Sequence, residues 1–218
     1  MPKNGHQIHK TDLDTPCLVI EKNALEFNLK VMRQHGQDTQ VNIRPHVKTH
    51  KCSQLAKLQM KYGAIGISAA KVSEAEGLIH AGIKNILITS PVVTPTKINR
   101  LMACFADAPE TLVVVDNEKN LYDLNTAGQS IQTKINVLID LDPGLGRTGI
   151  KPQIALNFAK KIMQFPWLNL KGIQCYAGNL QHIFSFEERK KRSLTVMEMA
   201  SSVVRQLKES GIPCDILT

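Results

Sequence analysis

The runs NILITS (residues 85–90) and TLVVVD (residues 111–116) decide the fold class. Each run is apolar almost throughout, whereas a half-buried strand alternates between apolar and polar residues. Continuous apolar runs of this length are typical of strands in a parallel sheet that is buried on both faces. Parallel strands need long crossover connections, usually helices, so the two runs predict an α/β protein.

Strand-like and helix-like patterns alternate along the rest of the chain. Strands are expected at 17–20, 41–48, 64–69, 85–90, 111–116, 135–141, 170–176 and 214–217, and helices at 22–35, 51–62, 73–81, 95–105, 117–126, 151–164 and 186–210. Ser73 and Glu76 predict a capping box, and Gly82 and Gly211 predict helix ends. No G-x-G-x-x-G follows the first strand, which disfavours a dinucleotide-binding sheet and favours a TIM-type (β/α)8 barrel.

Composition narrows the class of protein. The 218 residues include 27 Lys and Arg against 19 Asp and Glu, a net charge of +8, which suits nucleic acid, an anionic membrane or small anions. The basic residues are scattered except for RKKR (residues 189–192), which predicts an exposed helix face, so nucleic-acid binding is not expected. No apolar run is long enough to span a membrane. Five dispersed cysteines without a C-x-x-C pair suit the cytoplasm. We expect a polar tail at 1–14 without a signal peptide and a barrel domain at 15–218.

The stretch VNIRPHVKTHK (residues 41–51) brings cations to a predicted strand. Every second residue here is a cation or a histidine: Arg44, His46 and Lys48. On a strand these three side chains point to the same side, with Lys48 at the C-terminal end. If that side is the barrel interior, burial lowers the pKa of the lysine and makes it a better nucleophile and base. The alternative is an exposed strand edge with solvated cations.

Four ordered stretches resemble a known family: RPHVKTHK, ISAAKVSEAEGLIHAGIKNILIT, VLIDLDPGLGRTGI and GIQCYAGNLQHI. From about Thr15 onward the chain is similar to the D-threonine aldolase and D-serine dehydratase family, pyridoxal-phosphate enzymes with an alanine-racemase-like N-terminal barrel. The resemblance implies a lyase acting on small D-β-hydroxy amino acids, with retro-aldol cleavage to glycine and an aldehyde favoured. D-serine dehydration, racemisation and a non-catalytic barrel that binds pyridoxal phosphate are the alternatives.

The resemblance also implies roles for individual residues. Lys48 would form the Schiff base with pyridoxal phosphate, and Lys51 and Lys71 are the competing lysines. Arg147 would lie near the phenolic oxygen of the cofactor, and Tyr176 beside its ring. Arg147 could instead be a loop residue that pairs with Asp140 or Asp142.

His182 matches a histidine placed near the β-hydroxyl of the substrate in the aldolases, where a base of near-neutral pKa suits removal of the hydroxyl proton. Arg44 and His46 would shape the cofactor pocket and tune the lysine, with His50 farther out. Asn179 departs from the His or Ser often found at its position, which leaves the subfamily open.

Part of the family's machinery is expected beyond this sequence. After a strand like CDILT, relatives continue into a glycine- and threonine-rich loop that holds the cofactor phosphate. A later β-domain supplies a His with a Cys or Asp to a divalent metal. The resemblance therefore implies an incomplete barrel of seven strands, with 17–20 belonging to the β-domain and the metal ligands unassigned here. A homodimer is considered, because relatives with this barrel are commonly dimers.

Overall fold

The computed structural model describes residues 9–218, so the first eight residues of the expected tail lie outside the described part. The chain groups into two compact units, with the boundary between Val41 and Asn42. The first unit holds a short 3-10 helix, η1 (Lys10–Asp12), and helix α1 (Lys22–Thr39). Residues 17–20 have no regular secondary structure, and the Leu18 side chain is fully exposed. The strand prediction for 17–20 is wrong, because a short apolar run says nothing about whether a partner strand exists.

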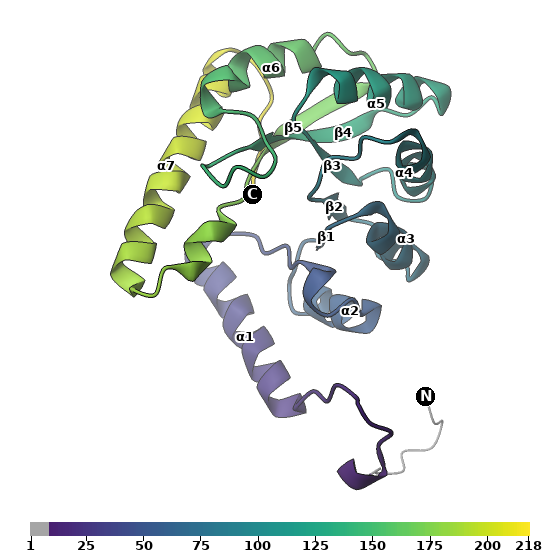
Figure 1. Ribbon diagram of the computed structural model, residues 1–218, viewed down its shortest axis with the longest axis vertical. Coiled ribbons are helices and arrows are strands. Elements are labelled where there is room, and N and C mark those ends of the chain that lie inside the picture. Colours follow the sequence, from purple (N-terminus) through teal and green to yellow (C-terminus); the bar gives the residue numbers. More distant parts are fainter. Residues whose placement is uncertain (1–8) are drawn as a thin grey trace. The chain divides into compact units, whose positions relative to one another are not determined.

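The second unit is built on one parallel sheet of six strands. These are β1 (Ile67–Ala69), β2 (Ile86–Ile88), β3 (Leu112–Val115), β4 (Ile135–Leu141), β5 (Leu168–Cys175) and β6 (Ile216–Leu217). Each strand pairs in parallel with the next along the chain. This order, with the sheet curling as it goes (Figure 1), is that of an incomplete (β/α) barrel. The predicted fold class is confirmed.

Helices follow the strands as the sequence predicts. They are α2 (Ser53–Lys61), α3 (Val72–His80), α4 (Pro95–Asp107), α5 (Glu118–Ser130), α6 (Ala155–Ile162) and α7 (Phe186–Glu209). All seven predicted helices, α1 included, are present, although the first turn of the helix expected at 151–164 is the 3-10 helix η3 (Pro152–Ile154). In the part of the chain that the model describes, no helix combines the length and the apolar character that a membrane span requires.

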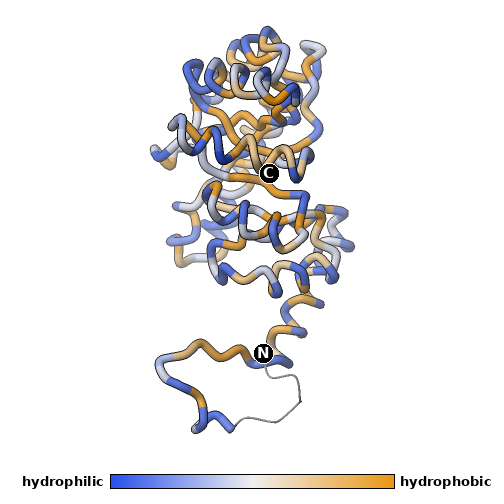
Figure 2. The backbone as a smooth tube through the Cα atoms, turned by 90° about the vertical axis from the view of Figure 1, so that its right-hand side faces the viewer, coloured by the Kyte–Doolittle hydropathy of each residue, from blue (hydrophilic) through white to orange (hydrophobic). Residues whose placement is uncertain are grey.

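Two groups of apolar side chains cover the two faces of the sheet. The larger group lies between the helices and the outer face of the strands. The smaller one consists of Leu87, Leu112, Val114 and Leu138, with Ile216 packed against it. Because alternate strand residues feed these two groups, β2 and β3 are buried along their whole length, which explains their continuous apolar sequences. In Figure 2 the helical coils mix hydrophilic (blue) and hydrophobic (orange) residues, as helices with one buried face do.

Helix α3 begins differently from the prediction. It starts at Val72, two residues earlier than a capping box at Ser73 requires, and no side chain caps its N-terminus. Glu74 becomes the third helical residue, and its Oε2 accepts a hydrogen bond from the Ala70 N–H at 2.8 Å. The predicted capping box is therefore wrong. The predicted ends at Gly82 and Gly211 are confirmed, with φ of +86° and +71° just beyond the helices.

Residues 41–48 do not form the predicted strand. The carbonyl oxygens of Ile43 and Pro45 accept hydrogen bonds from Ile65 and Ser68 at 3.0 and 2.8 Å, so the segment runs beside β1. However, Pro45 has no N–H to donate, and only one isolated bridge, between His46 and Ser68, is formed. The chain then turns into the 3-10 helix η2 (Val47–Thr49). The sheet consequently has six strands, one fewer than expected.

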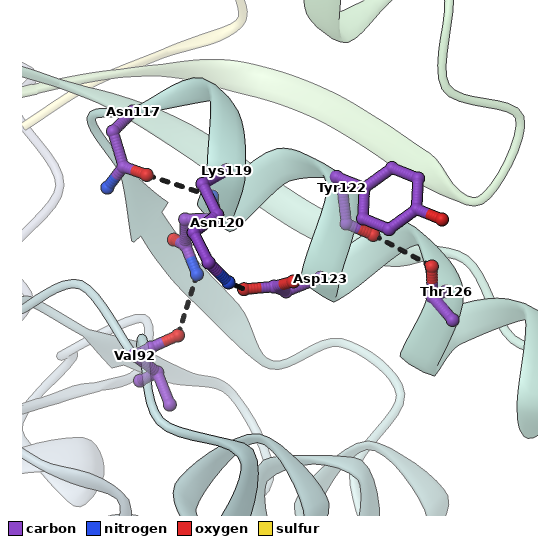
Figure 3. Close-up of polar contacts among 7 residues, drawn as sticks. All are labelled: Val92, Asn117, Lys119, Asn120, Tyr122, Asp123 and Thr126. Atoms are coloured by element: carbon purple, nitrogen blue, oxygen red, sulfur yellow. Dashed lines mark hydrogen bonds and ion pairs between the residues drawn. The ribbon is translucent and has the colours of Figure 1, made fainter.

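A buried contact fixes the start of α5 against the loop that follows β2 (Figure 3). Asn117 caps the helix by accepting a hydrogen bond from the Asn120 N–H at 2.8 Å. The Asn120 side chain, which is almost fully buried, donates to the Val92 carbonyl at 2.7 Å. This contact holds the loop just after the C-terminal end of β2, where one wall of the cavity described next begins.

Candidate active site

A cavity of about 330 Å³ opens among residues at or just beyond the C-terminal ends of the strands. Five of the six site residues expected from the sequence line it: Arg44, His46, Lys48, Arg147 and Tyr176. Their positions span more than 130 residues of sequence, and the parallel sheet brings them together because all its strands end at the same side.

Lys48 lies in η2, immediately after the segment that runs beside β1. The preceding residue, Val47, is only 3% exposed and anchors this turn in the core. The Lys48 Nζ lies 5.0 Å from the centre of the Tyr176 ring, a cation–π distance. Lys48 is otherwise exposed, so of the two alternatives that the sequence leaves open, an interior lysine and an exposed one, the exposed one holds. The turn that ends the strand-like segment carries the amine out toward solvent.

Arg147 reaches the same ring from the loop after β4. Its guanidinium carbon lies 5.2 Å from the centre of the Tyr176 ring, so one aromatic ring contacts two cations. The loop is shaped by Asp142, whose Oδ1 accepts hydrogen bonds from the N–H groups of Gly144 and Gly146 at 2.9 and 3.0 Å. These bonds lower the pKa of Asp142, with the one from Gly146 contributing most. Among the described residues no ion pair joins Arg147 to an aspartate, which leaves the arginine directed at the cavity.

His46 lies between Lys48 and the β2 side of the cavity. Its Nδ1 accepts a hydrogen bond from the Lys48 backbone N–H at 3.1 Å, and its Nε2 lies 3.1 Å from the Thr89 Oγ1. Burial and the nearby Lys48 cation lower the pKa of His46 to about 4, with Glu74 acting in the opposite direction. His46 is therefore a neutral imidazole at neutral pH.

Arg44 is anchored toward the N-terminal end of the sheet. Its Nη1 donates hydrogen bonds to the Asn85 carbonyl and to the Asn85 Oδ1 at 3.1 and 2.9 Å, and burial lowers the pKa of the guanidinium. A Cβ on Gly66 would lie only 2.2 Å from the Arg44 Nη1, so the absence of a side chain there makes room for the guanidinium. Arg44 therefore contributes a fixed positive charge to the floor of the cavity.

His182 is not brought to the cavity wall. It ends the 3-10 helix η4 (Gly178–His182), which follows β5, and its side chain is exposed. The preceding residue, Gln181, lines the cavity instead, with its Nε2 3.4 Å from the Tyr176 hydroxyl. The role expected for His182 stays a prediction.

The competing lysines and His50 also lie outside the cavity wall. Lys51 points to Glu74, with 3.8 Å between Nζ and Oε1, and Lys71 precedes α3 on the surface. The Nδ1 of His50 accepts a hydrogen bond from the Cys52 N–H at 3.1 Å, which supports the start of α2. Of the three candidate lysines, Lys48 is the one that reaches the cavity.

Comparison with known proteins agrees with this geometry. The family described as alanine racemase, N-terminal domain, matches residues 20–218. The chain belongs to this family. It is 37% identical over 207 residues to the D-threonine aldolase of Arthrobacter sp., covering 94% of this chain and 54% of that protein. It is 35% identical over 205 residues to the 3-hydroxy-D-aspartate aldolase of Paracoccus denitrificans strain Pd 1222, covering 93% and 53%.

The fold of this family member also matches solved structures. The crystal structure of D-threonine aldolase from Filomicrobium marinum superposes with a TM-score of 0.92 at 34% identity, covering 95% of this chain and 56% of that one. The chain thus spans about half the length of the relatives it matches. The resemblance stated from the four sequence stretches is confirmed.

Among the wall residues that the sequence did not single out are Thr89 and Gln174, and Asp140 contacts Gln174 from outside the cavity wall. Asp140 is 2% exposed and Gln174 5%, and the Gln174 Nε2 donates to the Asp140 Oδ1 at 2.8 Å. Burial raises the pKa of Asp140, although its hydrogen bonds from Gln174 and Thr148 act against that change. The sequence did contain a signal for Asp140 and Gln174: each is a polar residue near the end of an apolar strand, in VLIDL and GIQCY. A polar residue in such a strand is buried only when it has a hydrogen-bond partner, so each one indicates that a partner exists.

The wall residues suit the cofactor expected for the family. Among the described residues, the charged side chains on the wall are the cations Arg44, Lys48 and Arg147, and no Asp or Glu lines the cavity. An accessible amine, two guanidinium groups and an aromatic ring form a donor set for a planar anionic ligand with a carbonyl group, which describes pyridoxal phosphate. For a metal ion the described residues hold no group of three or more His, Cys, Asp or Glu side chains.

Proposed function

We propose that this chain forms the cofactor-binding part of a pyridoxal-phosphate lyase that cleaves D-β-hydroxy amino acids to glycine and an aldehyde. The observation that carries the proposal is the Lys48 amine, 5.0 Å from the centre of the Tyr176 ring, in a cavity whose charged wall residues are all cations. The two aldolases described above, at 37% and 35% identity, support cleavage over dehydration or racemisation. The activity of the whole protein is part of the proposal, because the chain spans about half of these relatives.

Three wall residues and His182 have roles in this proposal. Lys48 binds the cofactor through its amine, and Arg147 and Tyr176 orient it. Pyridoxal phosphate, when bound, supplies the electron sink that stabilises negative charge at the substrate Cα. His182 accepts the proton of the β-hydroxyl, so that a carbonyl forms at Cβ while the Cα–Cβ bond breaks. A divalent metal, a homodimer and a cytoplasmic location complete the proposal and rest on the sequence alone.

Chemical trapping tests the cofactor assignment. The chain is incubated with pyridoxal phosphate, reduced with borohydride, digested and examined by peptide mass spectrometry. We expect the adduct on Lys48, with Lys51 and Lys71 as controls within the same sample. Lys48→Arg keeps the positive charge and should remove the cavity label without increasing the label at the controls. An adduct spread evenly over surface lysines would contradict the assignment.

Product analysis tests the reaction. With D-threonine, cleavage yields glycine and acetaldehyde, whereas dehydration yields ammonia and a 2-oxo acid. We expect glycine as the product, and a lower rate for His182→Gln with the Lys48 adduct retained. Formation of the 2-oxo acid without glycine would favour the dehydratase alternative.

A further inference from the structure

A continuous series of hydrogen bonds connects the buried Asp140 on β4 to the turn that carries Lys48. The Gln174 Nε2 on β5 donates to the Asp140 Oδ1 at 2.8 Å and to the Thr89 carbonyl, just after β2, at 3.1 Å. The Thr89 Oγ1 lies 3.1 Å from the His46 Nε2, and the His46 Nδ1 accepts from the Lys48 N–H at 3.1 Å. The series crosses the interior of the sheet, and the proposed reaction assigns no role to its inner members.

The partners of Gln174 fix the orientation of its amide. A carbonyl oxygen and a carboxylate can only accept, so the NH₂ group must face both Thr89 and Asp140, and its two hydrogens are both used. The other Asp140 oxygen, Oδ2, accepts from the Thr148 hydroxyl at 2.8 Å. Both carboxylate oxygens are therefore engaged, and Thr89 is held from its backbone side by a buried, hydrogen-bonded pair.

The partners of His46 fix its tautomer in the same way. A backbone N–H can only donate, so the Nδ1 that receives the Lys48 N–H carries no proton. The proton of the neutral ring is then on Nε2 and is donated to the Thr89 hydroxyl oxygen. The Thr89 hydroxyl in turn donates to the Ala69 carbonyl at 3.2 Å, so the donor and the acceptor of each hydrogen bond from the Lys48 N–H to Ala69 are fixed.

We propose that Asp140, Gln174 and Thr89 are positioning residues that hold His46 as the Nε2–H tautomer and thereby fix the turn bearing Lys48. In the opposite tautomer the ring would present an N–H to the Lys48 N–H, and this cap of η2 would be lost. The assignment of Lys48 as the cofactor lysine rests on the proposed function. The tautomer and its dependence on Thr89 do not, because they follow from the contacts of the chain itself.

Two substitutions at one position separate hydrogen bonding from packing. Thr89→Val replaces the hydroxyl with a methyl group of similar size, and Thr89→Ser keeps the hydroxyl as the matched control. Nuclear magnetic resonance of ¹⁵N-histidine-labelled chain at neutral pH distinguishes protonated from bare ring nitrogens, and His46→Asn assigns the His46 signals. We expect Nε2–H in the wild type and in Thr89→Ser, and a mixture of tautomers in Thr89→Val.

The second readout is borohydride trapping of pyridoxal phosphate. In Thr89→Val the labelling of Lys48 relative to Lys51 should fall about 5-fold, the equivalent of one net hydrogen bond, and Thr89→Ser should recover most of this ratio. A bare Nε2 in the wild type, which needs no variant, would overturn the proposal. So would an unchanged tautomer and labelling ratio in a folded Thr89→Val.

The two proposals fail in different ways. If the tautomers behave as expected but no sample is labelled at Lys48, the positioning series stands and the cofactor assignment fails. If Lys48 is labelled selectively while Thr89→Val changes neither readout, the cofactor assignment stands and the positioning series is wrong.

Discussion

Acidification should destabilise the second unit through His46. The pKa of His46 is lowered from 6.5 to about 4 in the folded chain, by burial first and by the Lys48 cation second, with Glu74 opposing both. Between these two values the unfolded chain binds a proton that the folded chain does not. The free energy of unfolding therefore keeps its full His46 contribution above pH 6.5 and loses it as the pH falls toward 4.

The size of this loss in the free energy of unfolding follows from the difference between the two pKa values. The interval from 6.5 to about 4 corresponds to about 3 kcal/mol, since one pH unit is worth about 1.4 kcal/mol. His46 is only partly buried, and solvent screens part of the interaction, so we expect a loss of about 1–2 kcal/mol. Protonation also places a hydrogen on the Nδ1 that accepts from the Lys48 N–H, so the loss includes the cap of η2.

Urea denaturation over this pH range measures the effect, with His46→Asn as the matched control. Asparagine accepts a hydrogen bond at a helix N-terminus as well as any residue but does not titrate, so all other ionisable groups change equally in both proteins. The wild type should lose about 1–2 kcal/mol more than His46→Asn on acidification to pH 4. Parallel pH profiles, or a His46 resonance that titrates near 6.5, would refute the reasoning.

Three further substitutions test individual contacts. Gly66→Ala places a methyl group 2.3 Å from the Asn85 carbonyl oxygen and 2.2 Å from the Arg44 Nη1, and should lower the free energy of unfolding in urea by about 1–3 kcal/mol; an unchanged midpoint would contradict this. Asn120→Ala leaves the Val92 carbonyl without its buried donor and should cost about 1–3 kcal/mol, again measured in urea. Burial raises the pKa of Asp140 above 3.8, so wild-type stability should decline as the pH rises through the raised value. Asp140→Asn should abolish this decline, and identical pH dependence in the two proteins would show that burial does not govern this carboxyl.

The glycine substitution has a control within the same unit. Gly77 lies in α3 with no atom within 4 Å of the position of a Cβ. Gly77→Ala should therefore leave stability unchanged or raise it by about 0.5–1 kcal/mol through helix propensity. Similar losses at Gly66 and Gly77 would indicate that steric contact with Asn85 and Arg44 is not the cause.

The sequence predicted those parts of the fold that depend on local pattern. Strands β2 and β3 were found because both of their faces are buried, which leaves a continuous apolar run in the sequence. The same signal failed at 17–20, where an apolar run has no sheet to join. A short apolar run records the preference of a segment for burial, but pairing depends on a second segment that the run does not specify.

The site residues also fall into those that a local sequence pattern identifies and those that depend on contacts between distant segments. Arg44 and His46 were grouped correctly because residues two apart in an extended segment share one side, whereas Lys48 reaches the same cavity from the 3-10 helix η2. Gln174 and Asp140 were missed because their contact joins positions 34 residues apart, and each looks unremarkable within its own strand. A polar residue in a buried strand signals that some partner exists, but the partner is identified only when the sheet register is known.

The departure of residues 41–48 from the predicted strand explains how the site is built. A strand continued through Val47 would have carried Lys48 farther along the sheet. Because Pro45 cannot donate to a ladder, pairing with β1 is limited to the single bridge at His46, and the chain then turns at η2. His46 then lies at the N-terminus of that turn, where a side-chain acceptor is needed, and its Nδ1 supplies it. The same proline that interrupts the strand therefore allows the neutral His46 to accept a hydrogen bond from the Lys48 N–H. For this reason Pro45→Ala should change the exposure of Lys48 while the fold is retained.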